Sequence, residues 1–476
     1  MFTLSTDHIL AGPGYRICCL VRHSNGRGSQ SWTIRKDVGF NYAANFSQKS
    51  CRGFSPKGMA QRMKTRTFRM LLTLFLAGML SLHLVLAWNA AELIRKGYPD
   101  FTIFYSAGKI VRQGLGAKLY DEQTQYRIQQ EFAAGVSIRQ GPLPYNHPPF
   151  EALIFVPFTC LPYFAAYLLW DLMNLGILLA LRFLLRPHVP LLRQIPAAGW
   201  LFVSLAFFPV FIALLQGQDI ILLLLLFTLV FVSLKRNADF AAGCWLGLGI
   251  FRLHLVWPLL LILLLHKRRK AILGFLLVAL ALGVISIAVV GWKETLGYPG
   301  YVWHVEQTMG HRRTVVPMLM PNMRGLLDSL LTPSTSTVFR DIVSVLVSMG
   351  LKLFAASRWK ATNTTAFDLG FCLCVIVTVL VGYHSFAYDL SLLMLPIALV
   401  ANHVLESTPI HGWSRITLFG PLFLLFFTPL QMFLYIRNGH YNLMALVLLF
   451  WGWRIAGEIS RQAGVSQPKT TALQSV

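Results

Sequence analysis

The chain is poor in acidic residues and in charge of either sign. Its 476 residues include only 19 Asp and Glu, and charged residues make up 13%, whereas about 25% is usual for a soluble globular domain. Hydrophobic residues make up 55%, and runs such as "MLLTLFLAGMLSLHLVLAW" approach the roughly 20 residues that a helix needs to cross a bilayer. The composition therefore excludes an ordinary soluble domain and predicts an all-α polytopic membrane protein.

Metal-site and disulfide patterns are also missing. The seven cysteines show no disulfide or metal-site spacing, and Cys372 and Cys374 fall within an apolar run, where cysteine is usually a small hydrophobe. The 13 histidines include no H-x-x-x-H pair and no acid-rich cluster at ligand spacing. The sequence therefore predicts no cofactor and no metal ligands, and it leaves a divalent-metal requirement open.

The positive charge follows a membrane topology. The 42 Lys and Arg form short clusters between the apolar runs, as in cytoplasmic loops, so membrane lipids rather than nucleic acid are the expected surroundings. We expect a protein of the plasma (inner) membrane with both termini in the cytoplasm. Residues 1–62 are interpreted as a disordered tail or the result of an upstream start codon, because "MKTRTFRM" from Met63 resembles a natural start. Residues 461–476 form the second tail.

About ten spanning helices and two interruptions are expected within residues 63–460. The segment 240–265 has basic residues on both flanks and Arg252 in its middle, which favours a re-entrant hairpin over a crossing. The run 150–161, ended by Pro162, is too short to span and is expected to dip in from the outer face. The predicted spans are 70–88, 164–185, 198–214, 219–234, 271–290, 336–355, 366–382, 386–402, 416–436 and 441–456.

The polar groups with chemical potential concentrate in the outer loops, of which 89–149 and 291–322 are long. The first loop is predicted to hold a surface helix, a Gly-rich turn and a second helix that Asp121 caps. Asp100 lies at the membrane boundary, where the first of these helices begins. It is interpreted as a cap of that helix, as a catalytic carboxylate, or as both, because a carboxylate at a helix start is held in place and kept ionised by the helix dipole.

Histidine and arginine also gather in the outer segments. His147, in "PYNHPPF", is interpreted as a proton carrier, a phosphate partner or a loop hydrogen-bonder. The cations in and just after the second loop fit a phosphate group, whose oxygens match guanidinium forks, or else lipid head groups. These cations are His304, His311, Arg312, Arg313 and Arg324.

The order of the motifs resembles glycosyltransferase family 87 over roughly residues 70–455. The motifs are "DFTIFYSAGKIVRQGLGAKLYD" from Asp100, "YNHPPFEALIFVPFTCLP" from Tyr145, "GQD" at 217–219, "LGLGIFRLH", "PNMRGLL" and "HSFAYDLSLLMLP". Two positions depart from the family pattern, since Arg252 stands at the usual Lys and His147 at a place often held by an aromatic. The family belongs to the GT-C superfamily of integral-membrane transferases.

The resemblance implies a GT-C-like fold with short re-entrant or interfacial helices. It implies transfer of a hexose, mannose in the best-known relatives, from a polyprenyl-phosphate donor to a lipid or glycan acceptor on the extracytoplasmic face, with inversion. A GT-C enzyme keeps its general base on the first outer loop, and Asp100 matches that position; the cations of the second loop would hold the donor phosphate. The residues predicted to bind substrate are Tyr145, His147, Gln218, Arg252 and His384.

Two other functions are alternatives. A lipid-linked oligosaccharide polymerase or ligase would share the donor class and the outer face, but it would rely on a large late loop rather than on the first one. A secondary transporter would show broken helices at the midplane, repeat symmetry and short outer loops. The long loop 89–149 and the lack of a visible internal repeat disfavour the transporter.

Overall fold

The computed structural model divides into two units, Met1–Phe68 and Arg69–Val476. In the first unit the strands β1 (Val21–Ser24) and β2 (Gln30–Thr33) pair antiparallel, and helix α1 (Pro56–Arg95) begins there. The described residues are 21–24, 30–33, 56–135, 142–311, 317–331, 335–359, 365–406 and 412–465. Most residues of the two predicted tails lie outside these ranges, so the tails stay predictions.

Every described element that begins in the second unit is a helix, which confirms the all-α prediction for the membrane domain. The longer helices are α2 (Phe101–Arg112), α3 (Glu122–Ala133), α5 (Tyr163–Leu185), α7 (Ala197–Leu205), α8 (Phe208–Gln216), α9 (Ile220–Lys235), α10 (Asp239–Leu248), α11 (Leu253–Leu265), α12 (Arg269–Val290), α13 (Trp292–His311), α14 (Met323–Leu330), α15 (Thr337–Arg358), α16 (Thr365–Val381), α17 (Met394–Glu406), α18 (Gly412–Phe426) and α20 (Met444–Val465). The short ones are α4 (Ala152–Phe155), α6 (Leu191–Gln194), α19 (Thr428–Met432), the 3₁₀ turns η1 (Gly116–Lys118), η2 (Pro149–Glu151), η3 (Pro157–Cys160), η4 (Gly249–Arg252), η5 (Pro317–Leu319), η6 (Ala387–Leu393) and η8 (Tyr441–Leu443), and the π-helix η7 (Phe433–Arg437).

The number of spanning helices does not reach the expected ten. Among the described residues, six helical segments are long and apolar enough to cross a membrane, or eight if each of two bent pairs is one span. Ten spans are therefore not confirmed. Helices α9 and α16 are apolar but shorter than 18 residues, and α15 carries Arg340, Asp341 and Lys352. The spans expected at 198–214 and 416–436 are both broken, by bends of 80° and 59°.

The segment from α10 to α11 folds back on itself, as the hairpin prediction requires. By length and composition Asp239–Leu265 could cross as one helix, and a straight helix of that length would extend about 40 Å. Its two ends nevertheless meet, because Arg268 Nη1 lies 2.9 Å from Asp239 Oδ1. The chain reverses near η4, where Arg252 leaves helical geometry with φ −116° and ψ 57°.

Glycines allow α10 to lie directly against α12. A Cβ atom added at Gly243 would lie 1.8 Å from the carbonyl oxygen of Ala271, and one added at Gly274 would lie 2.3 Å from that of Phe240. Neither helix can keep its position with a larger residue at these sites, because the obstructing atoms belong to the backbone. Small residues at helix contacts are a common means of close packing in membrane proteins.

Replacing Gly243 by Ala is therefore expected to destabilise the protein. Overpacking typically costs about 1–3 kcal/mol, which thermal unfolding of the detergent-solubilised protein would show as a lower midpoint. Gly176→Ala on α5 is the matched control, since no atom of the described residues lies within 4 Å of an added Cβ there. The control is expected to be neutral or stabilising, because Ala favours a helix over Gly by up to about 1 kcal/mol. Equal midpoints for both variants would contradict the close α10–α12 contact.

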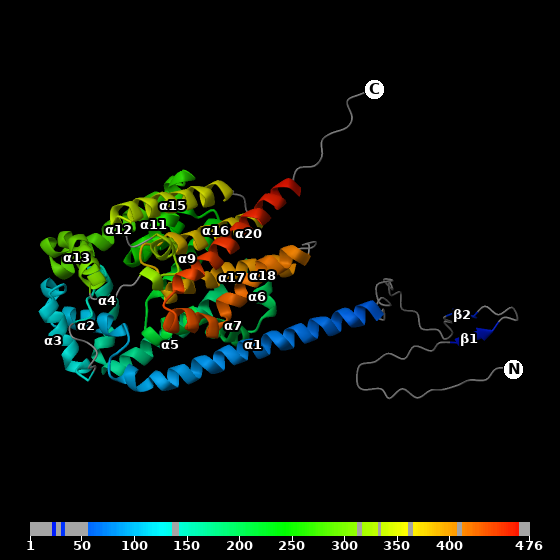
Figure 1. The fold of residues 1–476 in the computed structure, drawn as a ribbon, viewed down its shortest axis with the longest axis horizontal. Helices are drawn as coiled ribbons and strands as arrows, with labels where there is room; N and C mark the ends of the chain where they lie inside the picture. Colours follow the sequence, from blue (N-terminus) through cyan, green and yellow to red (C-terminus); the bar gives the residue numbers. More distant parts are fainter. Residues whose placement is uncertain are drawn as a thin grey trace, which may run out of the picture. The chain divides into compact units, whose positions relative to one another are not determined.

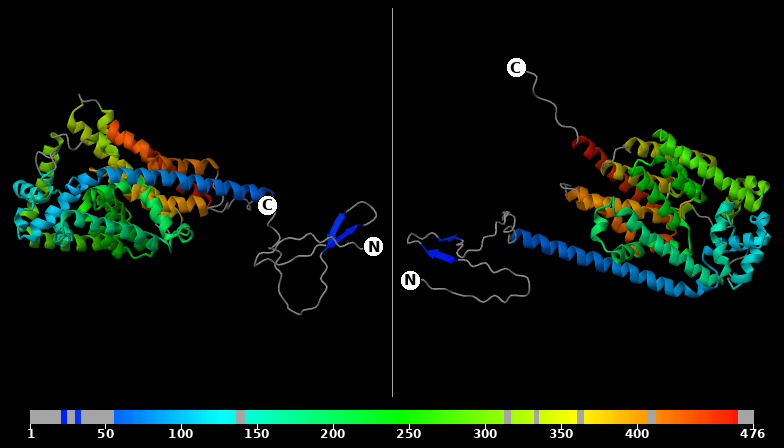
Figure 2. Two further views of the ribbon diagram at one scale, coloured as in Figure 1. Left: turned by 90° about the horizontal axis from the view of Figure 1, so that it is seen from below. Right: turned by 180° about the vertical axis from the view of Figure 1, so that it is seen from behind.

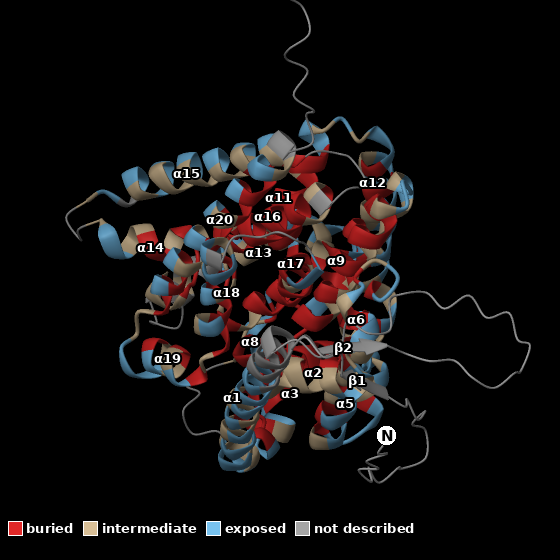
Figure 3. Ribbon diagram, turned by 90° about the vertical axis from the view of Figure 1, so that its right-hand side faces the viewer, coloured by how far each residue is buried: buried red, intermediate tan, exposed pale blue. Residues whose placement is uncertain are grey.

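The core of the second unit is formed by α9, α16 and α17, most of whose residues are buried (Figure 3). Helices α1 and α12 instead expose apolar side chains along much of their length. Examples are Leu74, Leu84, Leu276 and Leu280. Apolar helix surfaces of this length are the surfaces that a bilayer covers.

The long loop 89–149 folds into helices that gather with α13 at one end of the bundle (Figure 1, Figure 2). The expected surface helix is instead buried: Phe101 and Phe104 of α2 have no exposed surface. A Cβ atom at Gly108 would lie 2.8 Å from the carbonyl carbon of Phe155, so α2 packs tightly against the turn that follows α4. Aromatic packing of this kind fixes the start of α2, and with it the position of Asp100.

Candidate functional site

Asp100 opens α2 without capping it. Its side chain makes no capping hydrogen bond, whereas Asp121 caps α3, as predicted, by accepting a hydrogen bond from the backbone N–H of Thr124 at 2.9 Å. Asp100 Oδ2 accepts a hydrogen bond from Gln218 Nε2 at 2.7 Å, and the Asp100 N–H donates to Gln216 Oε1 at 3.1 Å. The capping interpretation is therefore not supported, and the carboxylate faces the chain that follows α8.

A sharp turn after α8 presents Gln218 and Asp219 to this carboxylate. Gly217 adopts a left-handed conformation with φ 62° and ψ 40°, which costs a residue with a Cβ roughly 1–2 kcal/mol. A Cβ atom there would also lie 2.6 Å from Cβ of Phe101. Glycine is thus required both for the backbone conformation and for the contact with Phe101. The turn leaves Gln218 and Asp219 buried, at 2% and 1% exposure.

Arg252 reaches this turn from the tip of the α10–α11 hairpin. Its Nε donates to Asp219 Oδ1 at 2.9 Å, and its Nη2 donates to Asp219 Oδ1 and to Gln218 Oε1. Because the Gln218 carbonyl accepts from a guanidinium, its amide N–H₂ must face Asp100. Nη1 of Arg252 lies 3.5 Å from Asp389 Oδ1 on the other side. The hairpin tip therefore orients the residue that holds Asp100.

The second carboxylate beside Arg252 comes from η6. Asp389 has no exposed surface, and its Oδ2 accepts a hydrogen bond from the backbone N–H of Phe386 at 2.7 Å. The ring of Tyr388 lies 5.4 Å from Arg252 Cζ, within the range of a cation–π contact. One buried guanidinium thus lies between two buried carboxylates, an arrangement that is stable only while the charges remain paired.

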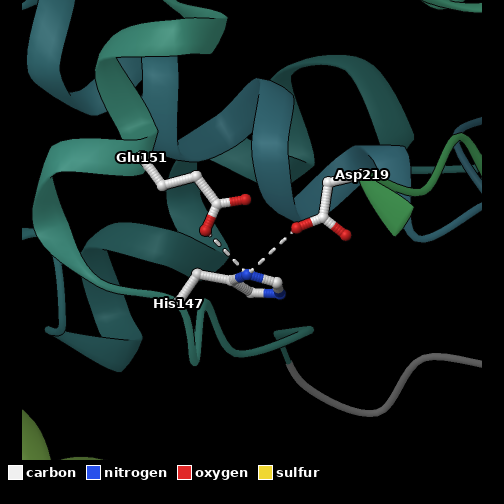
Figure 4. A group of neighbouring side chains, drawn as sticks. All are labelled: His147, Glu151 and Asp219. Atoms are coloured by element: carbon white, nitrogen blue, oxygen red, sulfur yellow. Dashed lines mark hydrogen bonds and ion pairs between the residues drawn. The ribbon is translucent and has the colours of Figure 1, made fainter. Parts of the chain in front are cut away.

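His147 and Glu151 lie next to Asp219 (Figure 4). His147 Nδ1 is 2.8 Å from Glu151 Oε2 and 3.8 Å from Asp219 Oδ2. Burial lowers the pKa of His147 to about 4, against the opposing effect of the Asp219 charge. Burial, reinforced by Asp219, raises the pKa of Glu151 well above its usual value. Burial thus favours the uncharged form of both side chains.

A cavity of about 830 Å³ brings the predicted residues together. Its apolar walls come from α11 and α12 and include Trp257, Ala279 and Leu282. A cavity of this size suits a small organic ligand, with apolar walls and a few polar groups that orient it. The predicted site residues that line it are Asp100, His147, Gln218, Arg252 and His384.

Comparison with known protein families matches residues 145–382, half of the chain, to Glycosyltransferase family 87. The protein belongs to glycosyltransferase family 87. It is thus a membrane glycosyltransferase, in agreement with its apolar helices. No curated protein and no solved structure matches the chain. The matched region includes His147, Gln218 and Arg252, whereas Asp100 precedes it.

Tyr145 of this family 87 protein lies behind the cavity wall rather than in it. It is 1% exposed and is not among the described residues that line the cavity. Its hydroxyl donates to the Pro148 carbonyl at 3.1 Å, and its backbone N–H donates to Gln125 Oε1 at 3.1 Å. Tyr145 therefore shapes the turn that carries His147, and its contact with substrate stays a prediction.

Of the predicted phosphate-binding cations, the structure places Arg324 beside the cavity. Arg324 Cζ lies 4.0 Å from the ring centroid of Tyr383, which lines the cavity, and Arg324 Nη1 donates to the Tyr383 carbonyl at 3.4 Å. His304 is exposed on α13 and is not among the described lining residues. The side chains of His311, Arg312 and Arg313 lie outside the described part of the chain.

Sequence reasoning missed three buried acids of this site. Glu151, Asp219 and Asp389 each lie within a motif that resembled family 87, in "YNHPPFE", "GQD" and "HSFAYD". The available signal was that ionisable residues beside apolar runs are rare and usually functional. Arg252, which pairs with Asp219 and Asp389, is distant in sequence from both. Glu151 meets Asp219 only in the fold, so the grouping of these acids was not visible from the sequence.

Proposed function

We propose that this protein transfers a hexose from a polyprenyl-phosphate donor to a lipid or glycan acceptor on the extracytoplasmic face, with inversion and with Asp100 as general base. The observation that carries the proposal is the Asp100 carboxylate, which lines the cavity and is held there by Gln218. Membership of a transferase family favours this reaction over secondary transport.

The base accounts for the acceptor half of the reaction. An acceptor hydroxyl loses its proton as its oxygen attacks the anomeric carbon, and one carboxylate within hydrogen-bond reach takes that proton. Gln218 and, behind it, Arg252 hold the carboxylate from one side. Inversion needs no second carboxylate as nucleophile, because the acceptor displaces the polyprenyl phosphate directly.

The apolar walls account for the lipid part of the donor. Leu253 and Trp257 line the cavity and are each 50% exposed, so the cavity opens on the α11–α12 side. Apolar side chains that are both cavity-lining and exposed provide a path along which a polyprenyl chain can lie in the bilayer while its phosphate enters the cavity. Cationic donors rather than an acid would then receive the departing phosphate.

The basic residues support an outward-facing site. Helix α9 runs from Asp219, beside the cavity, to Lys235, and its 16 residues rise about 24 Å. The basic cluster 235–237 lies at that far end. The cluster 266–270 lies there too, because Arg268 forms an ion pair with Asp239 at 2.9 Å. Clusters of Lys and Arg mark the cytoplasmic side. We therefore infer that the cavity faces the opposite, extracytoplasmic side.

The test is an assay of membranes that contain the protein. They are incubated with a panel of radiolabelled polyprenyl-phosphate hexoses, including the mannose form, and in parallel with nucleotide-activated hexoses. We expect transfer of label from one polyprenyl-phosphate sugar to lipid or glycan and none from the nucleotide sugars. Transfer from a nucleotide sugar alone would reject the proposed donor class.

Arg324→Ala is expected to weaken the use of the donor more than that of the acceptor. If the guanidinium holds the donor phosphate, its loss removes a charge-assisted hydrogen bond of about 1.5–3 kcal/mol, and donor-limited turnover falls roughly 10–100-fold. Arg324→Lys should restore only part of the rate, because Lys keeps the charge but not the planar fork. Initial rates at varied donor concentration measure the effect.

Arg437→Ala is the control for this prediction, because Arg437 is exposed and is not among the described lining residues. It is expected to keep the donor KM of the unmodified protein. An unchanged donor KM in Arg324→Ala as well would assign Arg324 to the lipid head groups.

A further inference from the structure

The wall of the cavity contains a cluster of one imidazole and two carboxylates. His147, Glu151 and Asp219 each offer one ligand atom, and these atoms all lie within 4.8 Å of one another. All three side chains are buried, at 7%, 1% and 1% exposure. His147 and Glu151 are four residues apart in one proline-rich turn, and Asp219 is brought to them by the turn after α8.

Two carboxylate oxygens in this cluster receive no hydrogen bond from a donor among the described residues, and the two carboxyl groups lie close enough to share a proton. These oxygens are Glu151 Oε1 and Asp219 Oδ2. Asp219 directs its other oxygen, Oδ1, to Arg252, so Oδ2 is left on the side of His147 (Figure 4). Buried polar atoms are almost always paired, and a buried carboxylate oxygen without a partner indicates a missing ligand or proton.

The charges around Arg252 point to a ligand of charge +2. Glu151, Asp219 and Asp389 carry three negative charges when ionised, and the single guanidinium that faces Asp219 and Asp389 supplies one positive charge. A divalent cation would balance the two excess negative charges. Buried charges persist when they are paired or when they coordinate a metal.

We propose that His147, Glu151 and Asp219 bind one divalent cation of the Mn²⁺ or Zn²⁺ class. The mixed donor set selects this class, because imidazole disfavours Mg²⁺ and Ca²⁺, which prefer oxygen ligands only. The ion ties the turn that carries His147 to the turn before α9 and so fixes one wall of the cavity. This site goes beyond the proposed transfer reaction and does not depend on it.

A second buried His–Glu pair in the chain serves as a matched control. His403 Nε2 lies 3.1 Å from Glu458 Oε1, and both side chains are buried, at 2% and 4% exposure. The third side chain beside this pair is Arg461, which donates a hydrogen bond to Glu458. It is a cation, whereas the third side chain beside His147 and Glu151 is a carboxylate. An ordinary hydrogen-bonded His–Glu pair should behave like this one and bind no metal ion.

The experiment measures metal binding on the full-length protein purified in detergent. After treatment with a chelator, Mn²⁺ is titrated in and the free ion is followed by electron paramagnetic resonance, with total Mn and Zn measured by mass spectrometry before stripping. We expect one ion per chain. Glu151→Gln and Asp219→Asn should each weaken binding by about 100-fold or more, since even outer partners of metal ligands are worth about 10–100-fold. Glu458→Gln should leave binding unchanged.

Two results would overturn the site. One is an unmodified, monodisperse protein that binds neither Mn²⁺ nor Zn²⁺ at millimolar concentration, which would leave a shared proton as the occupant. The other is retention of the ion in Glu151→Gln, whose amide keeps the shape of the side chain and so separates loss of a ligand from loss of folding. No sugar donor or acceptor enters the measurement, so its outcome is separate from that of the transfer assay.

Discussion

Replacing Asp100 by Asn is expected to lower the rate of sugar transfer by about 10²–10⁴-fold, the usual contribution of a positioned general base. The amide keeps the size of the side chain, and its oxygen can still accept the hydrogen bond from Gln218 Nε2. It cannot take a proton from the acceptor hydroxyl. The loss should therefore appear in kcat, while expression, membrane insertion and thermal midpoint stay close to those of the unmodified protein.

Asp121→Asn is the matched control on the same loop. Asp121 caps α3 through Thr124, and Asn caps a helix about as well as Asp, so this variant should transfer sugar normally. The comparison separates loss of a base from general damage to the loop. Full transfer activity in Asp100→Asn would remove Asp100 from the chemistry and leave its contacts with Gln216 and Gln218 as a structural connection between α2 and α8.

The hairpin could be predicted from the sequence because its signal is electrostatic. Basic flanks at both ends and Arg252 in the middle conflict with a single crossing, and only a reversal at η4 resolves that conflict. The bends at 198–214 and 416–436 could not be predicted, because proline does not always break a helix. Pro209 and Pro429 lie in the first turn of the second helix of each bent pair, yet Pro258 and Pro421 lie inside helices that continue.

Part of the candidate site could be predicted from the order of the motifs in the sequence. Motif order identified Asp100, Gln218 and Arg252, and the fold places them in one hydrogen-bonded chain. Burial was the missing information. Tyr145 in a polar-looking loop turns out to be covered on all sides, and Asp389 in an apolar run turns out to face Arg252. Neither property follows from residue type or spacing, because both depend on how distant helices pack.

Arg252→Met is expected to have the largest effect on stability. Arg252 is the cation that faces both Asp219 and Asp389, and it is only 6% exposed. Removing one partner of a buried ion pair typically costs about 3–5 kcal/mol, because the remaining charge is left buried and unpaired. Transfer should also be lost, because Gln218 then has no donor that holds its carbonyl and is free to rotate away from Asp100.

Two further variants separate charge from shape at this position. Arg252→Lys restores a positive charge, but an ammonium cannot reach Asp219, Asp389 and Gln218 with fixed geometry. It should recover most of the stability and part of the activity. In Arg252→Met combined with Asp389→Asn, one unpaired charge disappears, so the thermal midpoint should rise above that of Arg252→Met although transfer stays low. Arg252→Met could instead unfold at the same temperature as the unmodified protein. That result would mean that Asp219 and Asp389 do not carry buried charge, and it would reject an electrostatic connection from the hairpin tip to Asp100.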